Sequence, residues 1–333
     1  MKLSWETATL KLVSPFRIAH GTSKQRETVF VKLDEGVGEA AVVPYYGESA
    51  AGIIEYLSGL KVTDWDVFQF ETIIQGLPPG SQAARAAIDI ALYDLWGKRS
   101  GSPLFKLFGL DPDKIPQTSF TISIDEPVVM AEKASKSIWP ILKVKLGEQD
   151  DEAVIAAIRK ATQARLRVDA NAGWSREQAV DLIPRLAQYD LELVEQPLPV
   201  GDIEGLRILR SLNLGVPIFA DENVKTARDV AAHAGAVDGV VVKLMKCGGI
   251  HEALHAIETA KSLDMQVMIS CVVESSLGVT AAAHIASLCD FVDLDAPLLI
   301  ENDPYQGVSY MGANLVLPHT PGVGVMHKDS LSP

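Results

Sequence analysis

LRVDAN (residues 166–171), LELVEQP (191–197) and PIFADEN (217–223) are three short apolar segments that each lead into an acidic residue. The acids are Asp169, Glu195 and Asp221, and they stand at equal intervals along the chain. In a chain of alternating strands and helices, the interval corresponds to about one strand–helix unit. Each acid is therefore expected at the C-terminal end of its own strand, and the three carboxylates are expected at one mouth.

The same alternation continues on both sides of these segments. Helical patterns separate the strand-like segments; SREQAVDLIPRLAQ (175–188), for example, begins with a capping box of Ser175 and Gln178. Alternation of this kind implies parallel strands joined by right-handed crossovers, and eight such strands close into a barrel. We therefore predict an α/β fold with a (β/α) barrel of modified TIM type over residues 117–303. The other strand-like segments are TSFTISI (118–124), PILKVKL (140–146), GVVVKL (239–244), QVMISCVV (266–273) and FVDLDAP (291–297).

Residues 1–116 have a different pattern, which predicts an α+β capping domain. Residues 1–44 resemble β-strands, with a turn near Gly36 and a mobile loop at PFRIAHGTSKQRE (15–27). Residues 49–76 and 81–99 are predicted to be helical, the second because its apolar residues form one stripe. The Gly- and Pro-rich segment 304–333 does not continue the alternation and is predicted to return to the capping domain.

The composition excludes several classes of protein. The chain has 333 residues, and its formal net charge of −13 argues against nucleic-acid and anionic-membrane partners, which require basic patches. No apolar run approaches the roughly 18 residues needed to cross a bilayer, and the first residues do not resemble a signal peptide. The three cysteines form no C-x-x-C pair, so we interpret them as reduced thiols of a cytoplasmic protein.

The three acids predict a divalent cation. A single acid at such a position would more simply be a helix cap or an arginine partner, but three uncompensated like charges would destabilise the fold. Oxygen ligands favour Mg²⁺, with Mn²⁺ second, and the absence of His and Cys argues against zinc. We predict one Mg²⁺ per subunit, bound by Asp169, Glu195 and Asp221. The adjacent Glu222 is expected to point away and to pair with a lysine.

Three lysines lie in the strand-like segments that flank the acids. Lys143 and Lys145 point to the same side of one strand, and Lys243 ends another. Inner strands of a barrel have no solvated edge, so these amines are expected inside the mouth, with a depressed pKa that suits a general base. Lys145 is on the second strand and Lys243 on the sixth, across the barrel. Two bases on opposite faces of one carbon are what a racemase or epimerase requires.

Several of these motifs together resemble the enolase superfamily, in its muconate-lactonising subgroup. They are K-x-K (143–145), D-A-N (169–171), E-Q-P (195–197), A-D-E (220–222) and VKLMKCGG (242–249). The resemblance extends over essentially the whole chain, including the capping domain. It implies that Asp169, Glu195 and Asp221 bind Mg²⁺ and that Lys145 and Lys243 are the acid/base pair. Lys143 would help to stabilise the enolate that forms when a proton α to a carboxylate is removed.

Asp293 and Asp295 end the eighth strand with both side chains facing one way. A loop or capping pair is the simpler interpretation, but a D-x-D here is similar to that of dipeptide epimerases, where it holds the α-ammonium of an N-terminal residue. The resemblance implies an epimerase that inverts the C-terminal residue of L-Ala-X-type dipeptides by two-base proton transfer. Ser270 and Cys271, at the end of the seventh strand, are further candidates for binding this small-molecule substrate.

The second residue of the dipeptide stays open. Members of the family that act on Ala-Glu carry an arginine in the first mobile loop, whereas this chain has His20 and Gly21 there. His20 is therefore a candidate specificity residue, and Arg17, Lys24 and Arg26 are alternatives for a cation in the pocket. A hydrophobic second residue is also open, and the sequence does not decide whether the chain forms a homo-oligomer.

Other functions also remain open. The same scaffold supports N-acylamino-acid racemases, o-succinylbenzoate synthases and cycloisomerases, but their substrates lack the free ammonium that Asp293 and Asp295 would bind. A Schiff-base aldolase with Lys243 as nucleophile would leave the acids unexplained, since an imine mechanism needs no metal. A non-catalytic binding protein with this fold is the last alternative.

The segment HEALH (251–255) matches the H-E-x-x-H pattern of zinc proteases. It follows Gly-Gly at the start of an outer helix and has no third ligand in view, so we do not predict zinc there. The backbone N–H groups of this helix start are instead a candidate for binding a substrate carboxylate.

Overall fold

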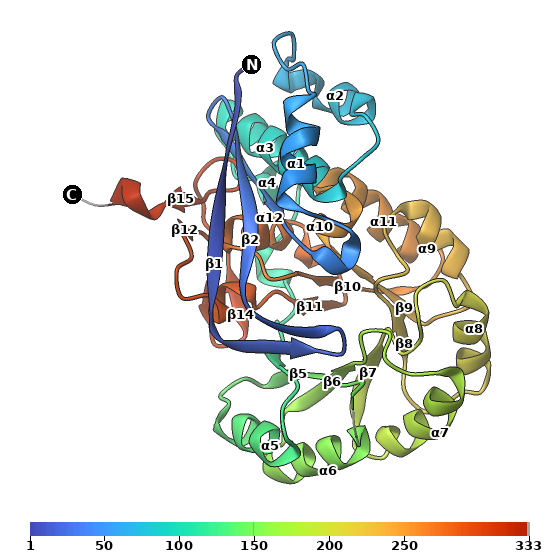
Figure 1. The fold of residues 1–333 in the computed structure, drawn as a ribbon. Coiled ribbons are helices and arrows are strands. Elements are labelled where there is room, and N and C mark those ends of the chain that lie inside the picture. The colour runs from blue at the N-terminus through green and yellow to red at the C-terminus, as the bar shows by residue number, and fades with distance from the viewer. Residues whose placement is uncertain (149, 332–333) are drawn as a thin grey trace.

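The computed structural model describes residues 1–148 and 150–331, and its central feature is a parallel sheet of eight strands that curls into a barrel (Figure 1). Neighbours in the sheet are neighbours in the chain, from β4 to β11. A bridge between Thr118 and Val292 brings the last strand beside the first, which confirms the predicted α/β barrel. The strands are β4 (Phe120–Ile122), β5 (Ile141–Lys145), β6 (Arg165–Asp169), β7 (Leu191–Glu195), β8 (Ile218–Ala220), β9 (Gly239–Val242), β10 (Gln266–Ser270) and β11 (Phe291–Asp293).

Helices surround the barrel and connect its strands (Figure 1). The capping box of Ser175 and Gln178 begins α7, as the sequence predicts. Inside the barrel, a separate apolar cluster includes Leu193, Phe219 and Met268. The helices are α5 (Pro127–Lys136), α6 (Asp151–Ala161), α7 (Arg176–Ala187), α8 (Ile203–Ser211), α9 (Ala227–His233), the short α10 (Leu244–Cys247), α11 (Ile250–Ser262) and α12 (Ser276–Ala283).

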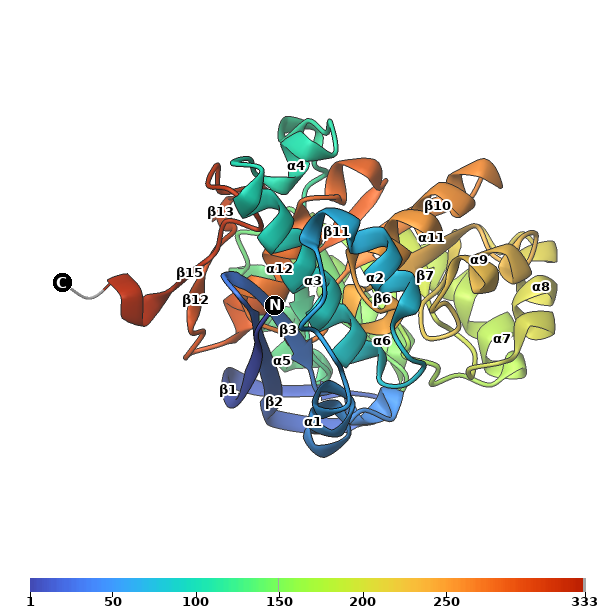
Figure 2. The ribbon, with the colours of Figure 1, turned by 90° about the horizontal axis from the view of Figure 1, so that it is seen from above.

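The N-terminal elements form an antiparallel sheet with helices packed against it. The strands are β1 (Leu3–Ile18), β2 (Gly21–Leu33) and β3 (Gly36–Ala41), and the helices are α1 (Ala50–Ser58), α2 (Phe70–Gly76), α3 (Gln82–Arg99) and α4 (Leu104–Leu107). The central helix α3 lies directly on β3. The two are so close that a Cβ at Gly38 would come within 1.9 Å of the Ala87 carbonyl oxygen, so only glycine fits there. From above, the N-terminal elements cover part of the barrel, whereas α7, α8 and α9 extend beyond them (Figure 2).

Two N-terminal predictions are wrong in detail. Residues 15–27 are not a loop: β1 and β2 continue through them as a hairpin, with Ile18 opposite Gly21. The backbone pairs across this hairpin regardless of its polar side chains, and Gly21 takes the positive φ of 132° at the turn. Residues 49–76 are not one helix, since α1 ends at Ser58 and α2 begins only at Phe70.

The C-terminal segment lies against the N-terminal elements. The Val323 N–H donates to the Asp94 carboxylate on α3, and the Leu104 N–H donates to the Gly322 carbonyl. The Tyr305 ring packs edge-on against Phe30 of β2, with ring centroids 5.0 Å apart. The short strands of the C-terminal segment form two small antiparallel pairs: β12 (Tyr305–Gln306) with β15 (Met326–His327), and β13 (Ser309–Met311) with β14 (Asn314–Val316).

Candidate active site

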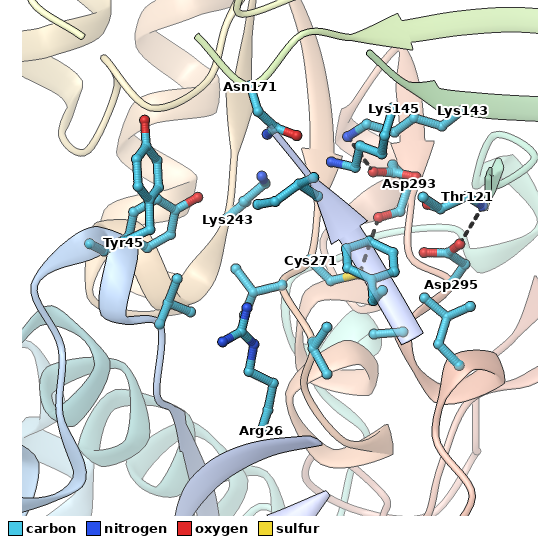
Figure 3. Close-up of a pocket in the computed structure, with 18 of the residues that line it drawn as sticks. Arg26, Tyr45, Thr121, Lys143, Lys145, Asn171, Lys243, Cys271, Asp293 and Asp295 are labelled. Atoms are coloured by element: carbon cyan, nitrogen blue, oxygen red, sulfur yellow. Dashed lines mark hydrogen bonds and ion pairs between the residues drawn. The ribbon is translucent and has the colours of Figure 1, made fainter. Parts of the chain in front are cut away.

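A cavity lies between the C-terminal ends of the barrel strands and the N-terminal elements (Figure 3). The β1–β2 hairpin and the segment after β3 contribute one wall, which includes Phe16, Arg26 and Tyr45. Figure 3 shows Lys243 on one side of the cavity and Lys145 with Lys143 on another. The barrel contributes Thr121, Lys143, Lys145, Asn171, Glu222, Lys243, Cys271, Asp293 and Asp295.

The three predicted metal ligands meet beneath this cavity. Asp169, Glu195 and Asp221 are fully buried at the ends of neighbouring strands β6, β7 and β8. The Lys143 ammonium links two of them, since its Nζ lies 3.2 Å from Asp169 Oδ2 and 2.7 Å from Glu195 Oε2. Lys243 Nζ lies 2.5 Å from Asp221 Oδ2 and 4.0 Å from Glu195 Oε1. The acids therefore form one cluster, as their spacing predicts.

The donor set of this cluster suits a hard divalent cation. Every acidic side chain offers oxygen, the ligand that Mg²⁺ prefers. Glu195 Oε2 is buried and, among the described residues, makes no hydrogen bond, although Lys143 Nζ is close to it. Burial and the charge of Asp169 raise the pKa of Glu195 well above its usual range. A cation bound between the acids would relieve both conditions, so the residues present fit Mg²⁺.

Lys145 and Lys243 reach the cluster from opposite parts of the barrel. Lys145 ends the second barrel strand, β5, and its Nζ donates to Asp169 Oδ2 at 2.6 Å. Lys243 directly follows the sixth strand, β9, and donates to Asp221. In a barrel of eight strands, the second and sixth lie across from each other. Both amines line the cavity, so both can reach a substrate there.

The expectation of depressed lysine pKa values is wrong for Lys143 and Lys243 in this structure. Burial lowers the pKa of each, but the surrounding carboxylates outweigh it and raise the pKa well above its usual range. For Lys143 the main charges are those of Asp293 and Glu195, and for Lys243 the main one is that of Asp221. The sequence places the lysines near the acids, but only the distances reveal that these charges prevail.

The two acids after β11 have different surroundings. Asp293 accepts hydrogen bonds from Lys143, Ser119 and Ser270. Burial alone would raise the pKa of Asp293, but Lys143 outweighs it and lowers the pKa to about 2. Among the described residues Asp295 accepts hydrogen bonds from Thr121 alone, its N–H at 2.7 Å, and burial with the charge of Asp293 raises the pKa of Asp295 to about 7. Asp295 therefore has the greater capacity to accept hydrogen bonds from a bound ammonium group.

The remaining sequence candidates lie at the edge of the cavity or behind it. Cys271 lines the cavity, and burial raises the pKa of its thiol well above the usual range. Ser270 lies behind Asp293, to which its hydroxyl donates, and is absent from the lining. His20 is exposed at the hairpin turn, where Nε2 contacts the Asn171 carbonyl oxygen at 2.6 Å and the ring stacks on Tyr45. His20 is not part of the lining itself, and it touches the lining residues Tyr45 and Asn171 from outside.

The prediction for Glu222 is wrong. Strand β8 ends at Ala220, so the alternation rule does not extend to Glu222, which lines the cavity and accepts a hydrogen bond from Asn171. Burial and the charge of Asp221 raise the pKa of Glu222 to about 7. Another residue that the sequence reasoning missed is the buried Lys246, which donates to Asp221 Oδ1 at 2.6 Å and anchors that carboxylate. Its place in VKLMKCGG is the only signal in the sequence.

Comparisons with known proteins agree with this geometry. Residues 5–109 match the family model of the mandelate racemase/muconate lactonizing enzyme N-terminal domain, and residues 128–330 match the enolase C-terminal domain-like model. An L-Ala-D/L-Glu epimerase of Bacteroides thetaiotaomicron is 39% identical, over 98% of this chain and 88% of that protein.

Two solved structures have the same fold over almost their whole length. One is a substrate-liganded complex of the L-Ala-D/L-Glu epimerase from Bacillus subtilis, with a TM-score of 0.92, 32% identity and 98% of each chain covered. The other is a dipeptide epimerase from Enterococcus faecalis complexed with Mg and L-Leu-L-Tyr. It has a TM-score of 0.90 and 35% identity, with 98% of this chain and 99% of that chain covered. In the part of the chain that is described, no helix has the length and apolar character needed to span a membrane.

Proposed function

Since the chain belongs to the enolase superfamily, in the group of mandelate racemase and muconate lactonizing enzyme, we propose that it is a Mg²⁺-dependent dipeptide epimerase. The observation that carries this proposal is the placement of Lys145 and Lys243 on opposite strands, at either side of one carboxylate cluster. The relatives named as dipeptide epimerases support it. Its substrate is an L-Ala-X-type dipeptide, of which it inverts the C-terminal residue.

The chemistry is a proton transfer at one carbon with two bases. One lysine takes the α-proton from one face, and the other returns a proton to the opposite face. Each amine must first leave its carboxylate, Asp169 for Lys145 and Asp221 for Lys243. Lys143, fixed between Glu195 and Asp293, keeps its positive charge beside the developing enolate. Mg²⁺ held by Asp169, Glu195 and Asp221 would supply positive charge that stabilises the enolate and opposes the raised pKa of Lys243.

Asp295 is proposed to bind the α-ammonium of the dipeptide, with Asp293 oriented behind it. Its buried carboxylate faces the cavity and has a single hydrogen-bonding partner residue among those described, Thr121. A cationic amine satisfies both the charge and the free acceptor sites. Substrates of N-acylamino-acid racemases, o-succinylbenzoate synthases and cycloisomerases lack this amine, so Asp295 favours a dipeptide over these alternatives.

Asp295→Asn should lower kcat/KM for free-amine dipeptides by about 10- to 100-fold, because hydrogen bonds to charged groups contribute about 1.5–3 kcal/mol. Rates on L-Ala-X dipeptides and on the same dipeptides N-acetylated provide the comparison within one variant. An equal loss for both series would exclude Asp295 as the ammonium site.

Arg26 is the cation that we propose to recognise the second residue of the dipeptide. It is half-buried in the cavity wall, and burial lowers its pKa. Its guanidinium makes no ion pair with any described carboxylate, whereas Arg17 is paired with Glu148. Figure 3 shows Arg26 on a different side of the cavity from Asp295. A dipeptide with its amine at Asp295 and an acidic side chain at Arg26 would compensate both charges.

Arg26→Leu should lower kcat/KM for L-Ala-L-Glu by about 10- to 100-fold through loss of a charged hydrogen bond. The rate on L-Ala-L-Leu should fall little or rise, because Ile18, Val272 and Leu299 make the rest of the wall apolar. The ratio of the two rates is the measurement. If wild type already prefers L-Ala-L-Leu and the ratio does not change, the second residue is hydrophobic and Arg26 does not select it.

We also propose a division of the chain into two parts. Residues 117–303 are the catalytic barrel, and residues 1–116 with 304–333 are the cap that closes over the substrate. The three cysteines are unbridged, which suits a cytoplasmic protein. The partner is a small molecule, and neither nucleic acid nor a membrane surface is expected to bind so acidic a chain.

A further inference from the structure

A histidine cluster lies outside the active-site cavity, where the barrel meets the cap. His251 and His255 are one turn apart on α11, with ring centroids 4.4 Å from each other. Glu252 of the same helix completes a set of three side chains whose ligand atoms lie within 4.8 Å of one another. None of the three lines the cavity.

The cap provides a fourth group that is distant in sequence. Glu71, near the start of α2, has its Oε2 2.8 Å from His251 Nε2. The sequence pattern covers only residues 251–255 of α11 and therefore cannot reveal a ligand from another element. The fold brings the Glu71 carboxylate of α2 into contact with His251 of that helix. Two imidazoles and two carboxylates therefore converge from two helices, one on each side of the interface.

The backbone around the cluster is held in place. The N–H groups of Ile250 and His251 donate to the buried carboxylate of Asp89 on α3. Asp89 approaches so closely that a Cβ at Gly249 would lie 2.2 Å from its Oδ1, which explains a glycine with φ 122°. The helix start is thus occupied by Asp89, and the prediction that it binds a substrate carboxylate is wrong.

The open side of the cluster gives an ion access. The His251 side chain is 11% exposed, the Glu71 side chain is 53% exposed, and His255 is on the surface. Glu252 Oε1 accepts the Ala227 N–H, which orients the carboxylate and leaves its second oxygen for a ligand bond. Zinc ligands lie roughly 2.0–2.2 Å from the ion. His255 and Glu71 are exposed, so their side chains can rotate to bring their ligand atoms to an ion beside His251 and Glu252.

We propose that His251, Glu252, His255 and Glu71 form a second metal site, which takes Zn²⁺ or a similar borderline cation. Imidazole nitrogen favours zinc over magnesium, whereas the all-oxygen cluster in the barrel has the opposite preference. The two sites therefore bind different ions in one chain. An ion held by Glu71 and both histidines ties α2 of the cap to α11 of the barrel.

The test is zinc binding to the full chain with Mg²⁺ in large excess, so that the barrel cluster stays occupied by Mg²⁺. Wild type, His255→Gln and a matched control, His327→Gln, are dialysed against dilute zinc chloride, and the bound metal is measured. We expect one zinc ion per chain in wild type and in the control, and its loss in His255→Gln. No zinc in wild type, or equal zinc in wild type and His255→Gln, would overturn the proposal.

Thermal unfolding provides a second readout. Zinc that binds only the folded chain raises the unfolding temperature, so the midpoint of wild type should rise with zinc concentration. Glu71→Gln should reduce this rise if the site joins the cap to the barrel, and an undiminished rise would contradict the role of Glu71. Neither measurement depends on epimerase activity, so the zinc site and the proposed function fail or succeed separately.

Discussion

Lys145→Ala and Lys243→Ala should each lose epimerisation by about 10²- to 10⁴-fold in kcat, the usual contribution of a general acid or base. Each substitution removes the amine on one face of the substrate carbon and leaves the other. Each variant should therefore still exchange the α-proton of one isomer with solvent, and the two variants should act on opposite isomers. Incorporation of deuterium from D₂O into separate L,L- and L,D-dipeptides, followed by mass spectrometry, measures this.

The control is Lys160→Ala, which removes an exposed lysine from the outer helix α6 and should behave as wild type. Near-normal epimerisation by both active-site variants would refute the two-base scheme. Exchange of the same isomer by both would place the two amines on one face. A single variant without effect would leave only a one-base mechanism.

The barrel could be predicted because its determinants are local. Each strand is a short apolar run, each helix has its own periodicity, and the right-handed crossover rule joins them. The hairpin of β1 and β2 could not be predicted in this way. Its tip is polar and exposed, and backbone hydrogen bonds, which leave no trace in the side-chain pattern, hold Arg17 opposite Thr22.

The active-site residues that stand at the ends of barrel strands could be predicted from the sequence. Those that the cap contributes were harder to predict. Asp169, Glu195 and Asp221 follow their strands directly, so their convergence follows from the fold. Arg26 reaches the cavity wall only through the packing of the cap, which no spacing in the sequence reveals. The same is true of Glu71, which reaches the histidine cluster outside the cavity.

Ionisation states were the least predictable feature of the site. The pKa of Lys243 is raised because its amine lies close to the Asp221 carboxylate. The pKa of Glu222 is raised because its side chain is buried beside Asp221, and it lies there because strand β8 already ends at Ala220. Neither the distance nor the end of the strand can be read from the order of residues.

Removal of the divalent cation should lower epimerisation by about 10³-fold or more, since a metal ion stabilises developing charge by several kcal/mol. Glu195→Gln should have a similar effect at low Mg²⁺, because Glu195 is the one acid of the cluster with a buried oxygen that accepts no hydrogen bond from a described residue and is paired only with the charge of Lys143. The measurement is the rate as a function of Mg²⁺ after treatment with EDTA. Wild type should recover fully, and the variant should need far more Mg²⁺ or fail to recover.

The control for this substitution is Glu204→Gln, at an exposed position on α8. The lysines allow a further distinction, because Lys143, Lys145 and Lys243 already neutralise the acids when no cation is bound. The chain should therefore stay folded in EDTA, as judged by circular dichroism, while its activity disappears. Unfolding in EDTA would make the cation structural, and full activity in metal-free buffer would exclude it from the reaction.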